Sequence, residues 1–144
     1  MLEDLRREVV RRGLANVTLT GDISHDRLGC LYARATAVLL TSRWIENSPQ
    51  VMLEAMAAGR CVIAPDHPPL REWVQDGRTG RLFAPADPDD LARVAREVLA
   101  DPRARASMAQ AARELVTARH DDRTIMEATE ALYRKAIRRC ALRW

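Results

Sequence analysis

The sequence has few cysteines, no long apolar run and no signal-like start, and each of these shortages excludes a class of protein. Its three cysteines, Cys30, Cys61 and Cys140, are odd in number and far apart, which argues against a disulfide framework and a zinc site. No apolar stretch reaches the roughly 18–20 residues of a membrane-spanning helix. The opening residues, Met1 to Asp4, are not those of a signal peptide. We therefore expect a cytoplasmic protein.

The chain also has no large excess of one charge, since 23 basic and 20 acidic residues leave a net charge of only +3. Such a small surplus does not indicate a nucleic-acid partner. Lys135 is the only lysine, so the basic residues are otherwise arginines, which reflects base composition more than function. The histidines His25, His67 and His120 are as scattered as the cysteines.

The composition that remains is that of an ordinary globular protein. The chain has 144 residues, of which 47% are hydrophobic and 30% charged. At roughly 100–200 residues per domain, this length allows one domain and no second one. We predict a single domain over residues 1–144 that ends in an amphipathic helix at about 123–144.

Apolar spacing and turn residues predict helices that alternate with short strands. The predicted helices cover residues 2–13, 24–35, 49–58 and most of the chain after Pro88, with breaks at 101–102 and 120–122. The predicted strands cover residues 17–20, 37–41, 61–64 and 81–83. The helix at 49–58 is expected to have Ser48 as its N-cap, Pro49 at its first position and Gly59 at its end. The strand at 37–41 is expected to be buried on both faces.

Strands joined by helices of this length are typical of an α/β fold with a parallel sheet. We therefore predict a Rossmann-like parallel sheet with flanking helices. A doubly wound domain normally begins with a strand, whereas the first element here is the helix at 2–13. We expect the sheet to be incomplete on its N-terminal side.

The segment from Thr41 to Gly59 carries the strongest chemical signal. Glu46 lies in the loop before the helix, and Glu54 follows after seven intervening residues. Unpaired backbone N–H groups at the start of this helix, from Asn47 to Met52, are suited to bind a phosphate. Neighbouring carboxylates can accept hydrogen bonds from sugar hydroxyls. The combination favours a nucleotide sugar. The alternative is that these are ordinary glutamates, one favoured by the helix dipole and one solvated. Neither a GxxxxGK[ST] loop nor a GxGxxG motif is present.

The run Glu46-Asn47-Ser48-Pro49, continued by Leu53-Glu54-Ala55-Met56-Ala57-Ala58-Gly59, resembles the core motif of the retaining GT-B glycosyltransferases of the "group 1" family. The similarity continues in Val62-Ile63-Ala64, in the segment from Glu72 to Phe83, and in Pro85 and Asp87. Upstream it includes residues 16–21 and 31–35. It therefore covers nearly the whole chain.

The resemblance implies that the chain is the C-terminal half of a GT-B fold, which holds the activated sugar donor. Glu46 would contact hydroxyls of the donor sugar as the catalytic residue. Backbone amides of Asn47 and Ser48 would face the sugar and the diphosphate, and Glu54 would bind the ribose hydroxyls. The implied substrate is a nucleoside-diphosphate sugar, with no cofactor and no metal, and the implied reaction is sugar transfer to a hydroxyl acceptor with retention, in polysaccharide or glycolipid synthesis.

The chain also departs from the family pattern. The family's phosphate-binding arginine and lysine have no counterpart, and neither the first strand of this half nor the N-terminal acceptor-binding half lies within the sequence. Pro68 and Pro69 replace a frequent glycine pair. Arg43 is a candidate substitute for the missing cation, the alternative being an exposed, solvated arginine. We therefore expect the isolated chain to be inactive.

The C-terminal segment 123–144 combines six basic residues and two acidic ones with an apolar stripe, formed by Ile125, Leu132, Tyr133, Ala136, Ile137, Cys140 and Trp144. We expect this stripe to pack on the domain core or on the missing half. The alternative is an anionic surface at the inner membrane face. The four methionines Met52, Met56, Met108 and Met126 are expected to fill the core. The competing functional hypothesis is a non-catalytic module that keeps the fold and self-associates, for example as a homodimer through an exposed sheet edge.

Overall fold

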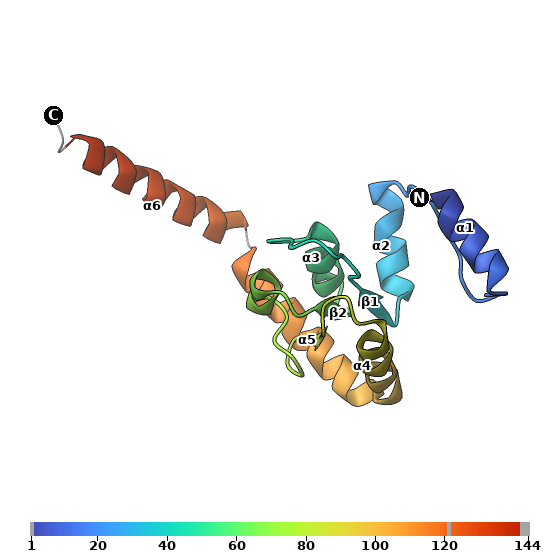
Figure 1. The fold of residues 1–144 in the computed structure, drawn as a ribbon. Coiled ribbons are helices and arrows are strands. Elements are labelled where there is room, and N and C mark those ends of the chain that lie inside the picture. The colour runs from blue at the N-terminus through green and yellow to red at the C-terminus, as the bar shows by residue number, and fades with distance from the viewer. Residues whose placement is uncertain (1, 121, 142–144) are drawn as a thin grey trace. The chain divides into compact units, whose positions relative to one another are not determined.

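The computed structural model describes residues 2–120 and 122–141 (Figure 1). Contacts between residues divide the chain into two compact units, Met1–Leu31 and Tyr32–Trp144. Each unit is described by itself below. A single domain over the whole chain stays a prediction.

The first unit contains helix α1 (Leu2–Arg11) and the start of helix α2 (His25–Arg34). Gly13 ends α1 with a left-handed φ of +64°, and the backbone N–H of Leu14 donates to the carbonyl of Val9. The predicted strand at 17–20 is wrong, because these residues form no ladder with another strand in the part of the chain that the structure describes. Backbone hydrogen bonds to a neighbour are what make a segment a strand.

The second unit is built on a parallel sheet of three strands in the order β1 (Ala37–Leu39), β2 (Cys61–Pro65) and β3 (Arg81–Phe83). Ala37 pairs with Cys61, and Ile63 pairs with Arg81. This arrangement confirms the predicted α/β fold with a parallel sheet and flanking helices. Among the described residues the sheet has three strands, where the sequence predicted four.

Burial differs between the central and the edge strands. All five residues of β2 are buried, since it has a neighbouring strand on each side. The expectation that β1 is buried on both faces is wrong: Leu39 is 45% exposed. Among the described strands β1 has only β2 as a neighbour, so one of its edges and part of its surface stay uncovered.

The described part of the second unit also contains five helical elements. The helix α3 (Gln50–Ala57) follows β1, the short 3₁₀ helix η1 (Pro68–Glu72) follows β2, and β3 is followed by α4 (Pro88–Ala100), α5 (Pro102–Arg119) and α6 (Asp122–Ala141). The predicted break at 101–102 is confirmed, and the Asp101 carboxylate caps α5 by accepting the backbone N–H groups of Arg103 and Ala104. Asp87 caps α4 in the same way.

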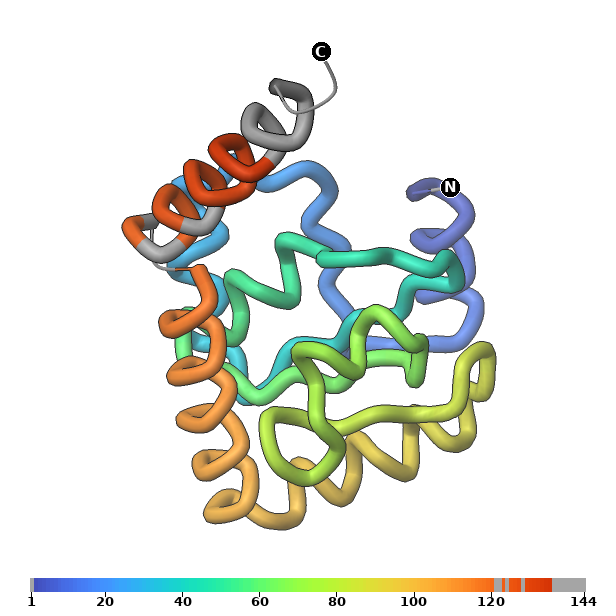
Figure 2. Tube along the Cα trace, turned by 90° about the vertical axis from the view of Figure 1, so that its left-hand side faces the viewer, coloured from blue at the N-terminus to red at the C-terminus, as the bar shows by residue number. Residues whose placement is uncertain are grey.

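Helices α4 and α5 cover one face of β2 and β3 (Figure 2). Their side chains form a buried cluster with the strands, made of Cys61, Ile63, Phe83, Val94, Val98, Met108 and Ala109. Burial raises the pKa of the Cys61 thiol to about 11, so it behaves as a core side chain. Cys30, in contrast, is exposed.

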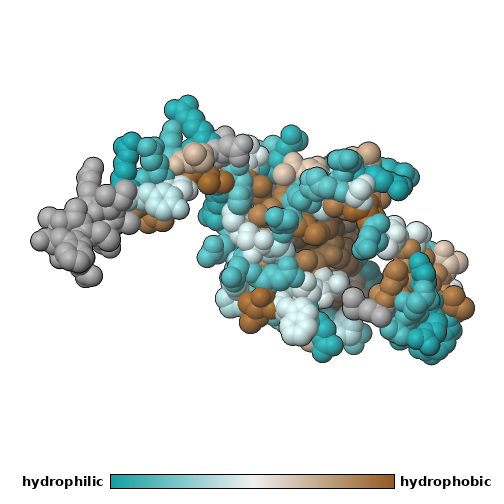
Figure 3. Space-filling model, turned by 90° about the horizontal axis from the view of Figure 1, so that it is seen from above, coloured by the Kyte–Doolittle hydropathy of each residue, from teal (hydrophilic) through white to brown (hydrophobic). Residues whose placement is uncertain are grey.

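The expected roles of the methionines and of the last helix are only partly confirmed. Met52, Met56 and Met108 are buried, but Met126 on α6 is 69% exposed. Leu132 and Tyr133 on the same helix are also exposed, so packing of these side chains on the domain core is not observed. The stripe's side chains from 136 onward lie outside the described residues. Apolar side chains at the surface are the brown areas of Figure 3. None of the described helices is long and apolar enough to span a membrane.

Gly80 allows the turn before β3 to approach β2 closely. A Cβ atom at this position would lie 2.6 Å from the backbone oxygen of Val62 and 3.0 Å from a methyl group of Val74. The same turn is held by Thr79, whose buried hydroxyl donates to the carbonyl of Trp73 and accepts from the backbone N–H of Gln75. The packing of this turn against β2 therefore requires a residue without a side chain at position 80.

We expect Gly80→Ala to lower the free energy of unfolding by about 1–3 kcal/mol, because the added methyl group must displace backbone atoms of the central strand. Gly29→Ala is the control, since a Cβ atom on this helical glycine meets nothing within 4 Å. That control should be neutral or stabilising by up to about 1 kcal/mol. Urea unfolding measures both. Equal stabilities of Gly80→Ala and the unmodified chain would contradict the close approach.

Candidate functional site

The candidate site lies where the parallel strands end. The carboxyl end of β1 leads into the loop from Leu40 to Pro49 and then into α3, β2 leads into η1, and β3 leads into α4. Since all three strands are parallel, these loops meet at one edge of the sheet. Ligands of open α/β sheets bind at this edge.

Glu46 lies in the loop between β1 and α3, and its side chain is half-buried. Its carboxylate accepts a hydrogen bond from the hydroxyl of Ser42, four residues earlier. Trp44 and Ile45, which lie between the two partners, are 82% and 68% exposed. The loop therefore turns Glu46 inward while the two apolar side chains before it face solvent.

Glu54 lies on the second turn of α3 and has a partner from another helix. The phenol oxygen of Tyr32, near the end of α2, donates to Glu54 Oε2 over 3.0 Å. Tyr32 is 8% exposed. Burial, with smaller contributions from the bond to Glu54 and from its charge, raises the pKa of Tyr32 to about 12.

The start of α3 differs in detail from the sequence prediction. Pro49, and not Ser48, is the N-cap residue, with an extended φ/ψ of −66° and 122°, and no side chain caps the helix. The first helical bond is donated by the backbone N–H of Met52 to the Pro49 carbonyl, over 3.0 Å. The N–H groups of Gln50 and Val51 therefore have no partner within the helix. This arrangement leaves a positive helix end next to Asn47 and Ser48, which are both exposed.

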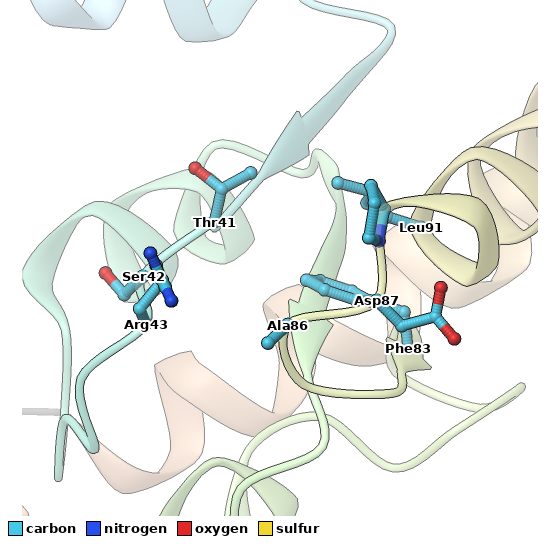
Figure 4. Close-up of a pocket in the computed structure, with 8 residues that line it drawn as sticks. Thr41, Ser42, Arg43, Phe83, Ala86, Asp87 and Leu91 are labelled. Carbon is cyan, nitrogen blue, oxygen red and sulfur yellow. The ribbon is translucent and has the colours of Figure 1, made fainter.

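Two cavities adjoin this loop. The first has a volume of about 400 Å³ and is lined by Thr41, Ser42, Arg43, Phe83, Ala86, Asp87, Pro88 and Leu91. Figure 4 shows Arg43 and its neighbours from the β1 side opposite Phe83, Ala86 and Leu91 from the β3 side. The second has a volume of about 430 Å³ and is lined by Asn47, Pro68, Pro69 and Glu72. Pro68 and Pro69 thus form part of a cavity wall beside the candidate site.

The structure gives Glu46 and Glu54 partners that the sequence did not assign, and it places Arg43 and Asn47 in the walls of two different cavities. Arg43 is exposed in the wall of the first cavity, Asn47 lines the second, and each glutamate is joined to a hydroxyl group. Tyr32 is 22 residues from Glu54 in sequence, and no spacing rule joins the two. Ser42 is four residues from Glu46, but in a loop that spacing has no fixed geometry.

Comparison with known proteins now identifies the family. Residues 2–115 match the family model of the glycosyl transferases group 1. The chain belongs to this family. It is 38% identical over 127 residues to a glycogen synthase of Mycobacterium tuberculosis, covering 88% of this chain and 30% of that protein. It is 30% identical to the α-D-kanosaminyltransferase of Streptomyces kanamyceticus, over 92% of this chain and 34% of that protein.

Solved structures agree with this assignment to the group 1 family. The sucrose-phosphate synthase of Thermosynechococcus elongatus superposes with a TM-score of 0.84 and 31% identity, over 94% of this chain and 34% of that one. Anabaena HepE in complex with UDP and glucose superposes with a TM-score of 0.83 and 28% identity, over 92% of this chain and 36% of that one. The fold of this group 1 chain is therefore that of a GT-B C-terminal domain, and the chain spans about a third of the length of the relatives that it matches.

The Tyr32–Glu54 contact predicts a pH dependence at alkaline pH. An unfolded phenol ionises near pH 10, whereas Tyr32 in the fold ionises at about 12. The stability that Tyr32 contributes is therefore complete below about pH 10 and is lost as the pH rises to about 12. The difference in unfolding free energy between the unmodified chain and Tyr32→Phe should therefore be constant below about pH 10 and shrink between about pH 10 and about pH 12. A difference that does not change with pH would contradict the raised pKa.

Proposed function

We propose that this chain is the donor-binding half of a retaining glycosyltransferase, which transfers a sugar from a nucleoside-diphosphate sugar to a hydroxyl acceptor in polysaccharide or glycolipid synthesis. The observation that carries the proposal is the pair Glu46 and Glu54, one before and one within α3, each accepting a hydrogen bond from a hydroxyl group. That HepE was solved with UDP-glucose supports a nucleotide sugar as the ligand.

In this proposal Glu46, the start of α3 and Glu54 each bind a different part of the sugar donor. Glu46 accepts hydrogen bonds from hydroxyls of the donor sugar and takes the catalytic role. The helix end at Asn47 and Ser48 faces the diphosphate, whose negative charge it stabilises. Glu54 accepts hydrogen bonds from the two ribose hydroxyls. In this proposal the backbone dipoles take the place of a metal ion, and no cofactor is needed.

Arg43 is proposed as a cation for the leaving diphosphate. It is exposed in the wall of the 400 Å³ cavity, directly after the hydroxyl groups of Thr41 and Ser42. Departure of a diphosphate needs stabilisation of the charge that develops on it, and an arginine supplies this with several N–H donors. The remaining two-thirds of the proposed enzyme, including its acceptor-binding domain, lie outside this sequence.

Binding of UDP, GDP and ADP, measured by calorimetry, tests the donor site. We expect weak binding of at least one of the three, and we expect Glu54→Gln to weaken it roughly fivefold or more, because two hydroxyl contacts lose a charged acceptor. Glu46→Gln should weaken it less, since none of these ligands carries the sugar. Glu127→Gln, on exposed α6, is the matched control and should leave the affinity unchanged. Absence of binding to all three at millimolar concentration would refute the donor site.

We also expect little or no sugar transfer by residues 1–144 on their own. The sequence supplies Arg43 but lacks the family's arginine and lysine pair, and the acceptor-binding domain lies elsewhere. The experiment incubates the purified chain with a simple hydroxyl acceptor and a nucleotide sugar. The nucleotide sugar is a derivative of whichever of UDP, GDP and ADP binds best, and the release of nucleoside diphosphate is measured. Robust turnover would show that this chain suffices for catalysis.

A second candidate function is a non-catalytic module that self-associates. The exposed edge strand β1, with Leu39 at 45%, and the exposed apolar side chains of α6 favour this alternative. Light scattering separates the two hypotheses, because a tight dimer that binds no nucleotide supports the module. Association of α6 with the inner membrane face is a further proposal, and co-sedimentation with anionic vesicles at several salt concentrations tests it.

A further inference from the structure

The loop between β1 and α3 is anchored at its two ends and makes few bonds between them. At the first end, the backbone N–H of Leu40 donates to the carbonyl of Ile63 on β2. At the other end, the carbonyl of Pro49 accepts from the backbone N–H of Met52 on α3. Residues 41–48 make no backbone hydrogen bond within the described part of the chain. The path of this segment is therefore not fixed by backbone pairing.

One side-chain contact joins the two sides of this segment. Ser42, directly after β1 (Figure 4), donates from its hydroxyl group to Oε1 of Glu46. Among the described residues this is the only hydrogen bond that the segment 41–48 makes. Both side chains are half-buried, whereas Trp44 and Ile45 between them are exposed. The contact thus closes a bend that turns Glu46 toward the protein.

A contact of this kind affects how well the carboxylate can bind a ligand. Hydrogen bonds to a charged acceptor are stronger than those between neutral groups. A loop and a glutamate side chain that become ordered only when a ligand binds lose conformational entropy, which lowers the affinity. A bond that orders them beforehand removes part of this loss. The serine hydroxyl takes one of the about four acceptor positions of an ionised carboxylate, so the contact is compatible with a hydroxyl ligand.

We propose that Ser42 is a positioning residue of the donor site, whose hydroxyl group holds Glu46 in the orientation that accepts the hydroxyls of the donor sugar. This inference rests on the proposed function, because Ser42 acts through Glu46 as a sugar ligand. Glu54 and the backbone N–H groups of Gln50 and Val51 lie on α3, outside the segment that the contact closes. Loss of the contact should therefore affect recognition of the sugar more than recognition of the nucleotide.

The test compares a nucleotide with its sugar derivative. Whichever of UDP, GDP and ADP binds best is titrated by calorimetry beside its glucose and mannose derivatives. The measured quantity is the ratio of the affinity of the tighter sugar derivative to that of the nucleotide. Ser42→Ala should lower this ratio roughly three- to tenfold, because the hydroxyl group that orders Glu46 is lost. Ser42→Thr keeps a hydroxyl group and should retain most of the ratio. Ser107→Ala, at an exposed position on α5, is the matched control and should leave it unchanged.

The possible results separate this inference from the proposed function. If Ser42→Ala weakens both ligands equally or weakens neither, the ratio stays the same, which overturns the inference while the nucleotide site stands. An equal fall of the ratio in Ser42→Ala and Ser42→Thr also overturns it, because only one of the two lacks the hydroxyl group. In a Glu46→Ala background, loss of the Ser42→Ala effect supports the inference and its persistence overturns it. No binding of any ligand by the unmodified chain overturns the donor site and the inference together.

A second measurement needs no ligand. Backbone ¹⁵N relaxation gives the order parameters of the amides of residues 43–48 in the unmodified chain, in Ser42→Ala and in Glu46→Ala. Both substitutions remove the same contact, so both should lower the order parameters of this segment by similar amounts, while those of β2 and α3 stay unchanged. Order parameters that are the same in all three proteins would show that the contact does not order the loop, and would overturn the inference.

Discussion

The site depends on the central strand β2, whose five residues are all buried. A strand buried in this way fixes the position of both of its neighbours, since β1 and β3 are held to it by parallel ladders. Gly80 brings the turn before β3 against the Val62 carbonyl, at a distance that leaves no room for a Cβ atom. The three loops that follow the strands are therefore anchored on one rigid element, and the candidate site is built from those loops.

The elements that the sequence predicts well are those with a strong local signal. Gly59 ends α3 with a φ of +68°, and Asp101 followed by Pro102 starts α5, because both residue types have a direct backbone reason to be there. Strand β2 is predicted from its unbroken apolar run. The strand expected at residues 17–20 has the same β-branched character, but a strand also needs a partner, and none is present among the described residues.

The sequence predicts the residues of the candidate site, but it does not predict the side chains that contact them. Glu46, Asn47, Ser48 and Glu54 are contiguous enough to form a motif, and the family resemblance gives that motif its meaning. Tyr32 contacts Glu54 although the two residues are 22 positions apart in the chain, so no local pattern joins them. The predicted N-cap of α3, Ser48, is wrong by one residue. The fixed φ of proline suits both the N-cap and the first helical position, and only the extended ψ of 122° shows that Pro49 is the N-cap.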